Sequence, residues 1–111
     1  MKFNLFTTSI KSPLSISFEH YNSESNRLVI YNTSSHSINS ADISLINSDN
    51  KKFLFKNRKL GQKSGNLIDY GHHPDENGKF FTGILNQVTI DYADHHLKFL
   101  VEKEKIFKLL K

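Results

Sequence analysis

The sequence predicts a single all-β domain, built as a sandwich of two antiparallel sheets. Apolar and polar residues alternate with a period of two along much of the chain, as they do in half-buried strands. Turn-forming residues separate these runs, and short strands with turns about every 8 to 12 residues are typical of sandwiches and barrels. A length of 111 residues suits one domain. We therefore expect residues 1–111 to share one core.

Two strands are expected in the first third of the chain. Leu14, Ile16 and Phe18 alternate with polar residues, which predicts a half-buried strand at residues 13–21. Residues 27–32 form a second apolar run, with apolar side chains on both faces. A strand that is apolar on both faces is expected near the middle of a sheet.

A polar loop and a hairpin are expected next. Residues 33–39 are mostly Thr, Ser, His and Asn, whose side chains bond the local backbone and favour a loop. Apolar residues then alternate over residues 41–45. The turn-forming residues 47–50 lead into another alternating run at residues 51–57, so we expect these two strands to pair.

The middle of the chain contains further turn signals. Gly61 and Gly65 bracket an expected turn before a strand at residues 66–70. Residues 75–78 have the sequence DENG, which ends in Asn-Gly, the strongest short hairpin dipeptide. We expect a turn there.

The last hairpin has the clearest pattern. Apolar residues alternate over residues 88–92 and again over residues 97–101, with an expected turn at Asp94 and His95. The tail, residues 102–111, fits a short helix and an edge strand equally well. Both alternatives stay open for the tail.

Composition limits how the domain is stabilised and where it works. The chain has no cysteine, so core packing must stabilise it without disulfides or a cysteine-based zinc site. Polar residues interrupt the apolar positions of the first ten residues, so we expect no signal peptide. No run approaches the roughly 18 apolar residues of a membrane span. We expect a cytoplasmic protein without a membrane span.

Two stretches carry a resemblance to a known kind of domain. They are LVIYNTSSHSINSADISLINSDNKKFLFKNRKLGQKSG and NQVTIDYADHHLKFLV. Their order of strands, polar loop, Leu-Gly turn and two long final strands resembles small bacterial immunoglobulin-like sandwich domains. The resemblance covers residues 27–101 and is one of pattern, without the paired cysteines and core Trp of antibody domains. It implies an immunoglobulin-like architecture and a binding or spacer role.

A basic stripe is the main candidate for a binding surface. Residues 51–63 contain six basic residues and no acidic one. Such a surface attracts an acidic protein or, beside exposed aromatic rings, single-stranded nucleic acid. Phe53 and Phe55 alternate with other residues and are expected in the core, which favours a protein partner. The candidate partner-binding residues are Lys51, Lys52, Lys56, Arg58, Lys59 and Lys63.

Histidine pairs are a weaker candidate, for metal binding. His72 and His73, like His95 and His96, have carboxylates nearby, and imidazole with carboxylate suits Zn, Ni or Fe. A site would form if the two pairs lay at the same end of the sandwich. Adjacent residues on a strand point to opposite faces, so each pair offers one ligand. We therefore favour solvated histidines and expect no cofactor.

No catalytic residues are expected. The chain lacks a G-x-S-x-G elbow, and GQKSG at residues 61–65 lacks the frame and following helix of a phosphate-binding loop. A function has to be argued from a site, and the sequence presents no catalytic one.

The sequence thus predicts a non-enzymatic protein-interaction module that binds another protein. Its sharper form is an inhibitor that blocks a host enzyme or nuclease by occlusion, as phage and mobile-element proteins of the anti-CRISPR kind do. The alternatives are single-stranded nucleic-acid binding through the basic stripe and metal binding through the histidine pairs. Exposed aromatic residues would mark an interface, and the tyrosines to compare are Tyr21, Tyr31, Tyr70 and Tyr92.

Overall fold

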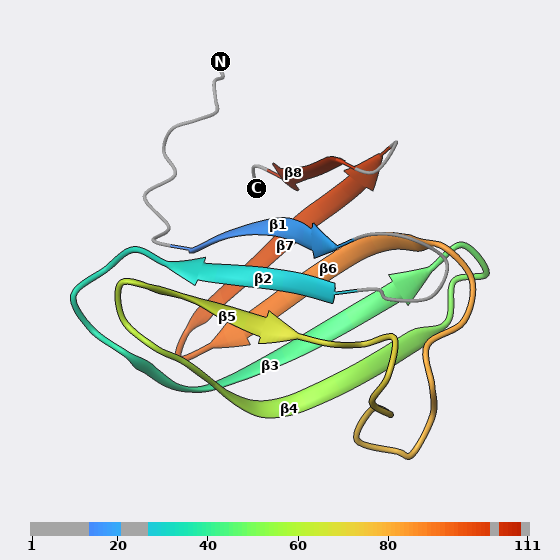
Figure 1. Ribbon diagram of the computed structural model, residues 1–111, viewed down its shortest axis with the longest axis horizontal. Helices are drawn as coiled ribbons and strands as arrows, with labels where there is room; N and C mark the ends of the chain where they lie inside the picture. Colours follow the sequence, from blue (N-terminus) through green and yellow to red (C-terminus); the bar gives the residue numbers. More distant parts are fainter. Residues whose placement is uncertain (1–13, 21–26, 103–104, 110–111) are drawn as a thin grey trace.

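The computed structural model describes residues 14–20, 27–102 and 105–109, and within these ranges it contains eight strands and no helix (Figure 1). In chain order the strands are β1 (Leu14–His20), β2 (Arg27–Asn32), β3 (Ile38–Asn47), β4 (Lys52–Leu60), β5 (Ser64–Ile68), β6 (Leu85–Tyr92), β7 (His95–Glu102) and β8 (Lys105–Leu109). The prediction of an all-β sandwich of two antiparallel sheets is confirmed.

The strands form a three-stranded sheet and a five-stranded sheet. The first has the order β1-β2-β5 and the second the order β4-β3-β6-β7-β8, with every neighbouring pair antiparallel. β2 therefore lies in the middle of its sheet, as its two apolar faces predicted. β8 pairs with the edge of β7 and lies beside β1 of the other sheet (Figure 1).

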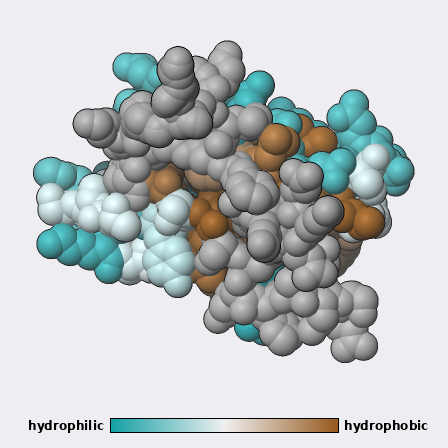
Figure 2. Space-filling model, turned by 90° about the horizontal axis from the view of Figure 1, so that it is seen from above, coloured by the Kyte–Doolittle hydropathy of each residue, from teal (hydrophilic) through white to brown (hydrophobic). Residues whose placement is uncertain are grey.

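The core lies between the two sheets and is filled by alternate residues of their strands. In the larger sheet, Ile43 of β3 is fully buried and stands opposite the fully buried Ile90 of β6. In the smaller sheet, Leu28 and Ile30 of β2 are fully buried. Each such side chain stabilises the fold by roughly 1.5–3 kcal/mol. Hydrophilic residues gather at the two ends of the molecule, with apolar ones between them (Figure 2).

β4 is longer than predicted because a bulge changes its phase. Ile43 is paired with Phe55 but Ala41 with Arg58, so β4 has one extra residue at this point. Asn57 adopts a positive φ of 58° there, as bulges allow. The extra residue returns Leu60 to the core, where it is fully buried. The strand therefore continues past residue 57 to its end at residue 60.

Two other boundaries of the central strands differ from expectation. The predicted loop at residues 33–39 ends earlier, because Ile38 packs against the core and pairs with Leu60. Gly65 lies within β5 rather than in a turn, and it pairs with Tyr31 of β2. In both cases a contact with a distant strand decides the boundary.

The C-terminal hairpin has the predicted pairing with a shifted turn. Tyr92 pairs with His95, so the turn consists of Ala93 and Asp94, and Ala93 takes a positive φ of 50°. The tail alternative of an edge strand is confirmed over residues 105–109, where β8 pairs with β7. Tyr21 lies outside the described part of the chain, and so do residues 103–104 and 110–111 of the tail.

Candidate functional site

The loop between β5 and β6, residues 69–84, is fastened to edge strand β4 by Asp75. The Asp75 carboxylate accepts hydrogen bonds from the backbone N–H groups of Leu54 at 3.0 Å and of Asn77 and Lys79 at 2.9 Å each. The N–H of Glu76 donates to the Leu54 carbonyl at 2.7 Å. The loop thus pairs with both outward backbone groups of Leu54, which protects the middle of an edge strand from other chains.

The surroundings of Asp75 keep its carboxyl ionised. Burial raises its pKa, but the backbone hydrogen bonds from Lys79, Leu54 and Asn77 and the charge of Lys79 outweigh burial, so the pKa of Asp75 lies below its ordinary value. A carboxylate that accepts several backbone N–H bonds is stabilised in its charged form. Asp75 therefore has a structural role in holding the loop.

A second contact ties the same loop to the turn between β3 and β4. The buried Asn47 side chain donates from Nδ2 to the Thr82 carbonyl at 2.8 Å. Its Oδ1 accepts from the N–H groups of Asp49 at 2.9 Å and Lys51 at 2.8 Å. Asn47 thus shapes the hairpin turn and holds the far end of the loop against it.

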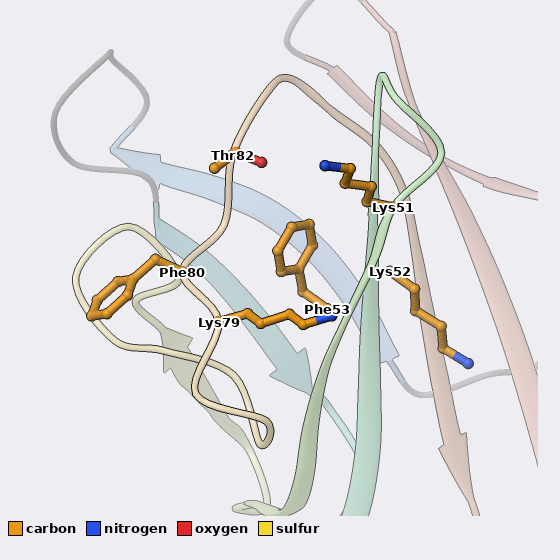
Figure 3. Close-up of a pocket in the computed structure, with 6 residues that line it drawn as sticks. All are labelled: Lys51, Lys52, Phe53, Lys79, Phe80 and Thr82. Carbon is orange, nitrogen blue, oxygen red and sulfur yellow. The ribbon is translucent and has the colours of Figure 1, made fainter.

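An open hollow of about 560 Å³ lies between these two attachments (Figure 3). This volume falls within the roughly 300–1,000 Å³ of ordinary ligand pockets. Its lining residues are Lys51, Lys52, Phe53, Lys79, Phe80 and Thr82. Lys51 from the hairpin and Lys79 from the loop extend toward the hollow from opposite sides, with the Phe53 ring between them, whereas Lys52 points away (Figure 3). The described lining residues include no carboxylate.

Aromatic packing makes the floor of the hollow firm. Phe53 is 4% exposed, and its ring centroid lies 5.0 Å from that of Phe81. Phe81 in turn packs edge-on against the buried Tyr70 at 4.9 Å. Phe80, the residue before Phe81, points the other way (Figure 3) and is 56% exposed. The hollow therefore combines a fixed apolar floor with one exposed ring at its margin.

The predicted basic stripe is divided by the structure. Lys51 and Lys52 line the hollow, whereas Lys63 lies in the turn before β5, at the other end of the sandwich. Arg58 is half-buried, with its guanidinium carbon 5.4 Å from the centre of the Phe55 ring. Phe55 belongs to the core, as expected, and so does Phe53.

Three lysines of the stripe, including Lys52 beside the hollow, lie on the outer face of β4. Lys52 and Lys56 are exposed there, and the bulge at Asn57 leaves Lys59 exposed as well. Lys56 is 3.9 Å from the carboxylate of Glu76. This row continues the positive surface of the hollow along the edge of the larger sheet.

Three loop residues of the hollow, Lys79, Phe80 and Thr82, were not predicted from the sequence. Lys79 and Phe80 lie far along the chain from the basic stripe, and only the docking of the loop onto β4 brings them beside Lys51. The predicted turn at residues 75–78 is present, with Gly78 at a positive φ of 80°. Because this turn folds back on β4 rather than joining two strands, it places Lys79 at the hollow.

A second exposed surface lies on the outer face of the three-stranded sheet. Tyr31 is 44% exposed and Leu67 is 48% exposed, and between them Gly65 leaves room for the ring. A Cβ atom at Gly65 would lie 2.8 Å from Val29 Cγ1 and 3.0 Å from Tyr31 Cε1. A hollow of about 470 Å³ beside Tyr31 is also lined by Lys63. Of the other described tyrosines, Tyr70 is buried and Tyr92 is half-buried.

The histidine pairs do not come together. His72 lies in the β5–β6 loop, where its Nδ1 is 3.1 Å from Asp69 Oδ1. His96 lies at the start of β7 and contacts Asp91 of β6. These positions are at opposite ends of the sandwich (Figure 1), so the pairs cannot share one metal ion. In the part of the chain that the structure describes, no group of three or more His, Cys, Asp or Glu residues is placed to hold a metal.

The chain matches no family model, no curated protein and no solved structure. Among the described residues there is no helix long and apolar enough to cross a membrane. The hollow and the charged row beside it are therefore the features of the molecule that bear on its function.

Proposed function

We propose that this protein is a non-enzymatic binding module that docks onto an acidic surface of another protein. The hollow carries this proposal: Lys51 and Lys79 extend toward it, no described lining residue is acidic, and Phe80 at its margin is 56% exposed. Protein interfaces combine apolar anchors with a polar rim. In the hollow the aromatic rings correspond to the apolar anchors and the lysines to the polar rim. The positive charge of the lysines favours an acidic partner.

The outer row of β4 supports the same partner chemistry. Lys52, Lys56 and Lys59 extend the positive surface beyond the hollow. Exposed charges of one sign steer an oppositely charged protein toward its docking position. The hollow would supply contact area, and the row would speed association.

This role needs no catalytic group. His72 and His96 each contact a carboxylate, but their side chains are 51% and 56% exposed, and neither lines the hollow. Catalysis by such a pair depends on a positioned nucleophile and a site that limits access of water. Binding to another protein requires neither a positioned nucleophile nor a site that limits access of water.

We further infer an immunoglobulin-like type of sandwich from the strand order. The sheet β1-β2-β5 corresponds to strands A, B and E, and the series β4-β3-β6-β7 corresponds to C′, C, F and G of a variable-type domain. A small module of this kind can inhibit an enzyme or nuclease by covering its surface. An inhibitor of the anti-CRISPR kind remains the sharper form of the proposal.

A pull-down tests the proposed function. The purified protein serves as bait in lysate of its native host, with and without nuclease, beside a bait carrying Lys52→Glu, Lys56→Glu and Lys59→Glu. We expect a stoichiometric acidic protein that survives nuclease and is lost from the charge-reversed bait. Thermal unfolding of both baits checks that the variant is folded. Recovery of nucleic acid alone, or equal capture by both baits, would contradict the proposal.

A second candidate function is single-stranded nucleic-acid binding at Tyr31. The exposed Tyr31 ring lies over Gly65, and Lys63 lines the adjoining hollow. An exposed ring beside a cation can stack a base and neutralise a phosphate. Titration of a labelled oligothymidine with the protein and with Tyr31→Ala at several salt concentrations decides this candidate, since phosphate contacts make affinity fall steeply with salt.

A further inference from the structure

The hollow at Lys51 and Lys79 is held in shape before any partner arrives. Asp75 attaches the β5–β6 loop to Leu54 at 3.0 Å, and Asn47 attaches it to Thr82 at 2.8 Å. Both of these side chains are buried. A site that is already shaped loses little conformational entropy when it binds. The hollow is thus suited to hold a short segment of another chain.

The distribution of charge in the hollow defines what kind of segment fits. Lys51 and Lys79 approach from opposite sides, and the Phe53 ring lies between them (Figure 3). The complementary chain has a carboxylate at each side and an apolar side chain in the middle. Longer acidic segments would also meet Lys52 and Lys56 on the outer face of β4.

We infer that this hollow binds an acidic peptide segment of the partner, with an apolar side chain inserted between two carboxylates. The apolar side chain contacts Phe53, the carboxylates pair with Lys51 and Lys79, and the exposed Phe80 ring at the margin of the hollow meets a neighbouring residue of the peptide. This inference rests on the proposed function and deepens it by naming the partner's recognition element.

A peptide fits the hollow better than a nucleic acid does. Phe53 is 4% exposed and packs against Phe81 at 5.0 Å, so it offers a floor rather than a free ring for stacking. Proteins that bind single-stranded nucleic acid instead use a positive groove with several exposed aromatic rings along it.

Peptide titration tests the inference. The probe is a fluorescein-labelled ten-residue peptide of glutamates with one central leucine, measured by fluorescence anisotropy against the full chain. Two control peptides replace the leucine with serine or the glutamates with glutamine. We expect both controls to bind at least tenfold more weakly than the probe.

Matched protein variants locate the site. Lys51→Ala with Lys79→Ala removes two charges at the hollow, and the distal pair, Lys63→Ala with Lys98→Ala, removes two charges in the turn before β5 and on β7. We expect at least tenfold weaker peptide binding for the hollow pair and less than threefold for the distal pair. Thermal unfolding curves establish that both variants are folded.

Several outcomes would overturn the inference. These are equal loss of binding in the two variants, no binding of the probe at millimolar concentration, and tighter binding of a single-stranded oligonucleotide than of the peptide at the hollow. If the pull-down partner is retained by the Lys51 and Lys79 variant but lost from the bait reversed on the outer row of β4, the peptide site is wrong while the proposed function stands.

Discussion

The carboxylate of Asp75 accepts a hydrogen bond at 3.0 Å from the backbone N–H of Leu54, 21 positions earlier in the chain. This bond joins a long loop to the edge of the larger sheet and builds one wall of the proposed binding site. The same contact covers part of a strand edge that would otherwise be open to pairing.

Replacement of Asp75 by alanine is expected to destabilise the protein by about 2–3 kcal/mol, because three backbone N–H groups lose a charged acceptor. Urea unfolding measures the change. The exposed Asp49, on the turn between β3 and β4, provides the control, and Asp49→Ala should change stability by less than about 0.5 kcal/mol. Equal effects of the two replacements would show that the Asp75 attachment is unimportant.

Acid should weaken the fold through the same carboxylate. The folded-state pKa of Asp75 is lowered from its ordinary value of 3.8, so the ionised group contributes stability that is fully present above that value. The contribution disappears as the pH falls below 3.8 through the folded-state pKa. Urea unfolding between pH 2 and 7 should therefore show an additional loss of stability below about pH 4, and Asp75→Asn should lack it. A parallel pH profile in wild type and variant would contradict this linkage.

Gly65→Ala should destabilise the protein by about 1–3 kcal/mol, because the new methyl would lie 2.8 Å from Val29 Cγ1. Combining it with Val29→Ala should restore part of the loss relative to the sum of the two single changes. A thermodynamic cycle of the four proteins measures this coupling. Strict additivity would mean that the two positions do not meet as described.

Phe80→Ala should separate binding from stability. The side chain is 56% exposed, so its loss is expected to change the unfolding free energy by less than about 0.5 kcal/mol. Binding of the acidic peptide should weaken by roughly 5- to 30-fold, because the exposed Phe80 ring contacts the peptide at the margin of the hollow. Leu67→Ala, at a 48% exposed position on the other sheet, is the matched control and should leave peptide binding unchanged.

Much of the strand layout could be predicted from local patterns. The range of β2 and its place in the middle of a sheet were correct, because apolar residues on both faces favour a strand with a neighbour on each side. Its outer face is only partly buried, since Tyr31 is 44% exposed. The extension of β4 through Leu60 was missed, since the bulge at Asn57 interrupts the period of two. The start of β3 at Ile38 was missed because its neighbours are polar and only pairing with β4 makes it a strand.

The candidate site was predicted only in part. Lys51 and Lys52 were predicted to bind a partner, and both are among the residues that line the hollow. Lys79 escaped prediction because a turn signal does not say which strand the turn will contact. The shared metal site considered for the histidine pairs fails for the same reason, since loop position in the fold, and not spacing in the chain, put them at opposite ends.

The sequence by itself determined the all-β class, the approximate strands and most of the core, because these depend on a repeat of two residues that is visible in any short segment. The tertiary structure alone decided which strands are neighbours beyond the two predicted hairpins, how the β5–β6 loop closes over β4, and which lysines surround one apolar hollow. Those features depend on hydrogen bonds and packing between residues far apart in the chain, such as Asp75 with Leu54 and Asn47 with Thr82, and a local pattern contains no information about such pairs.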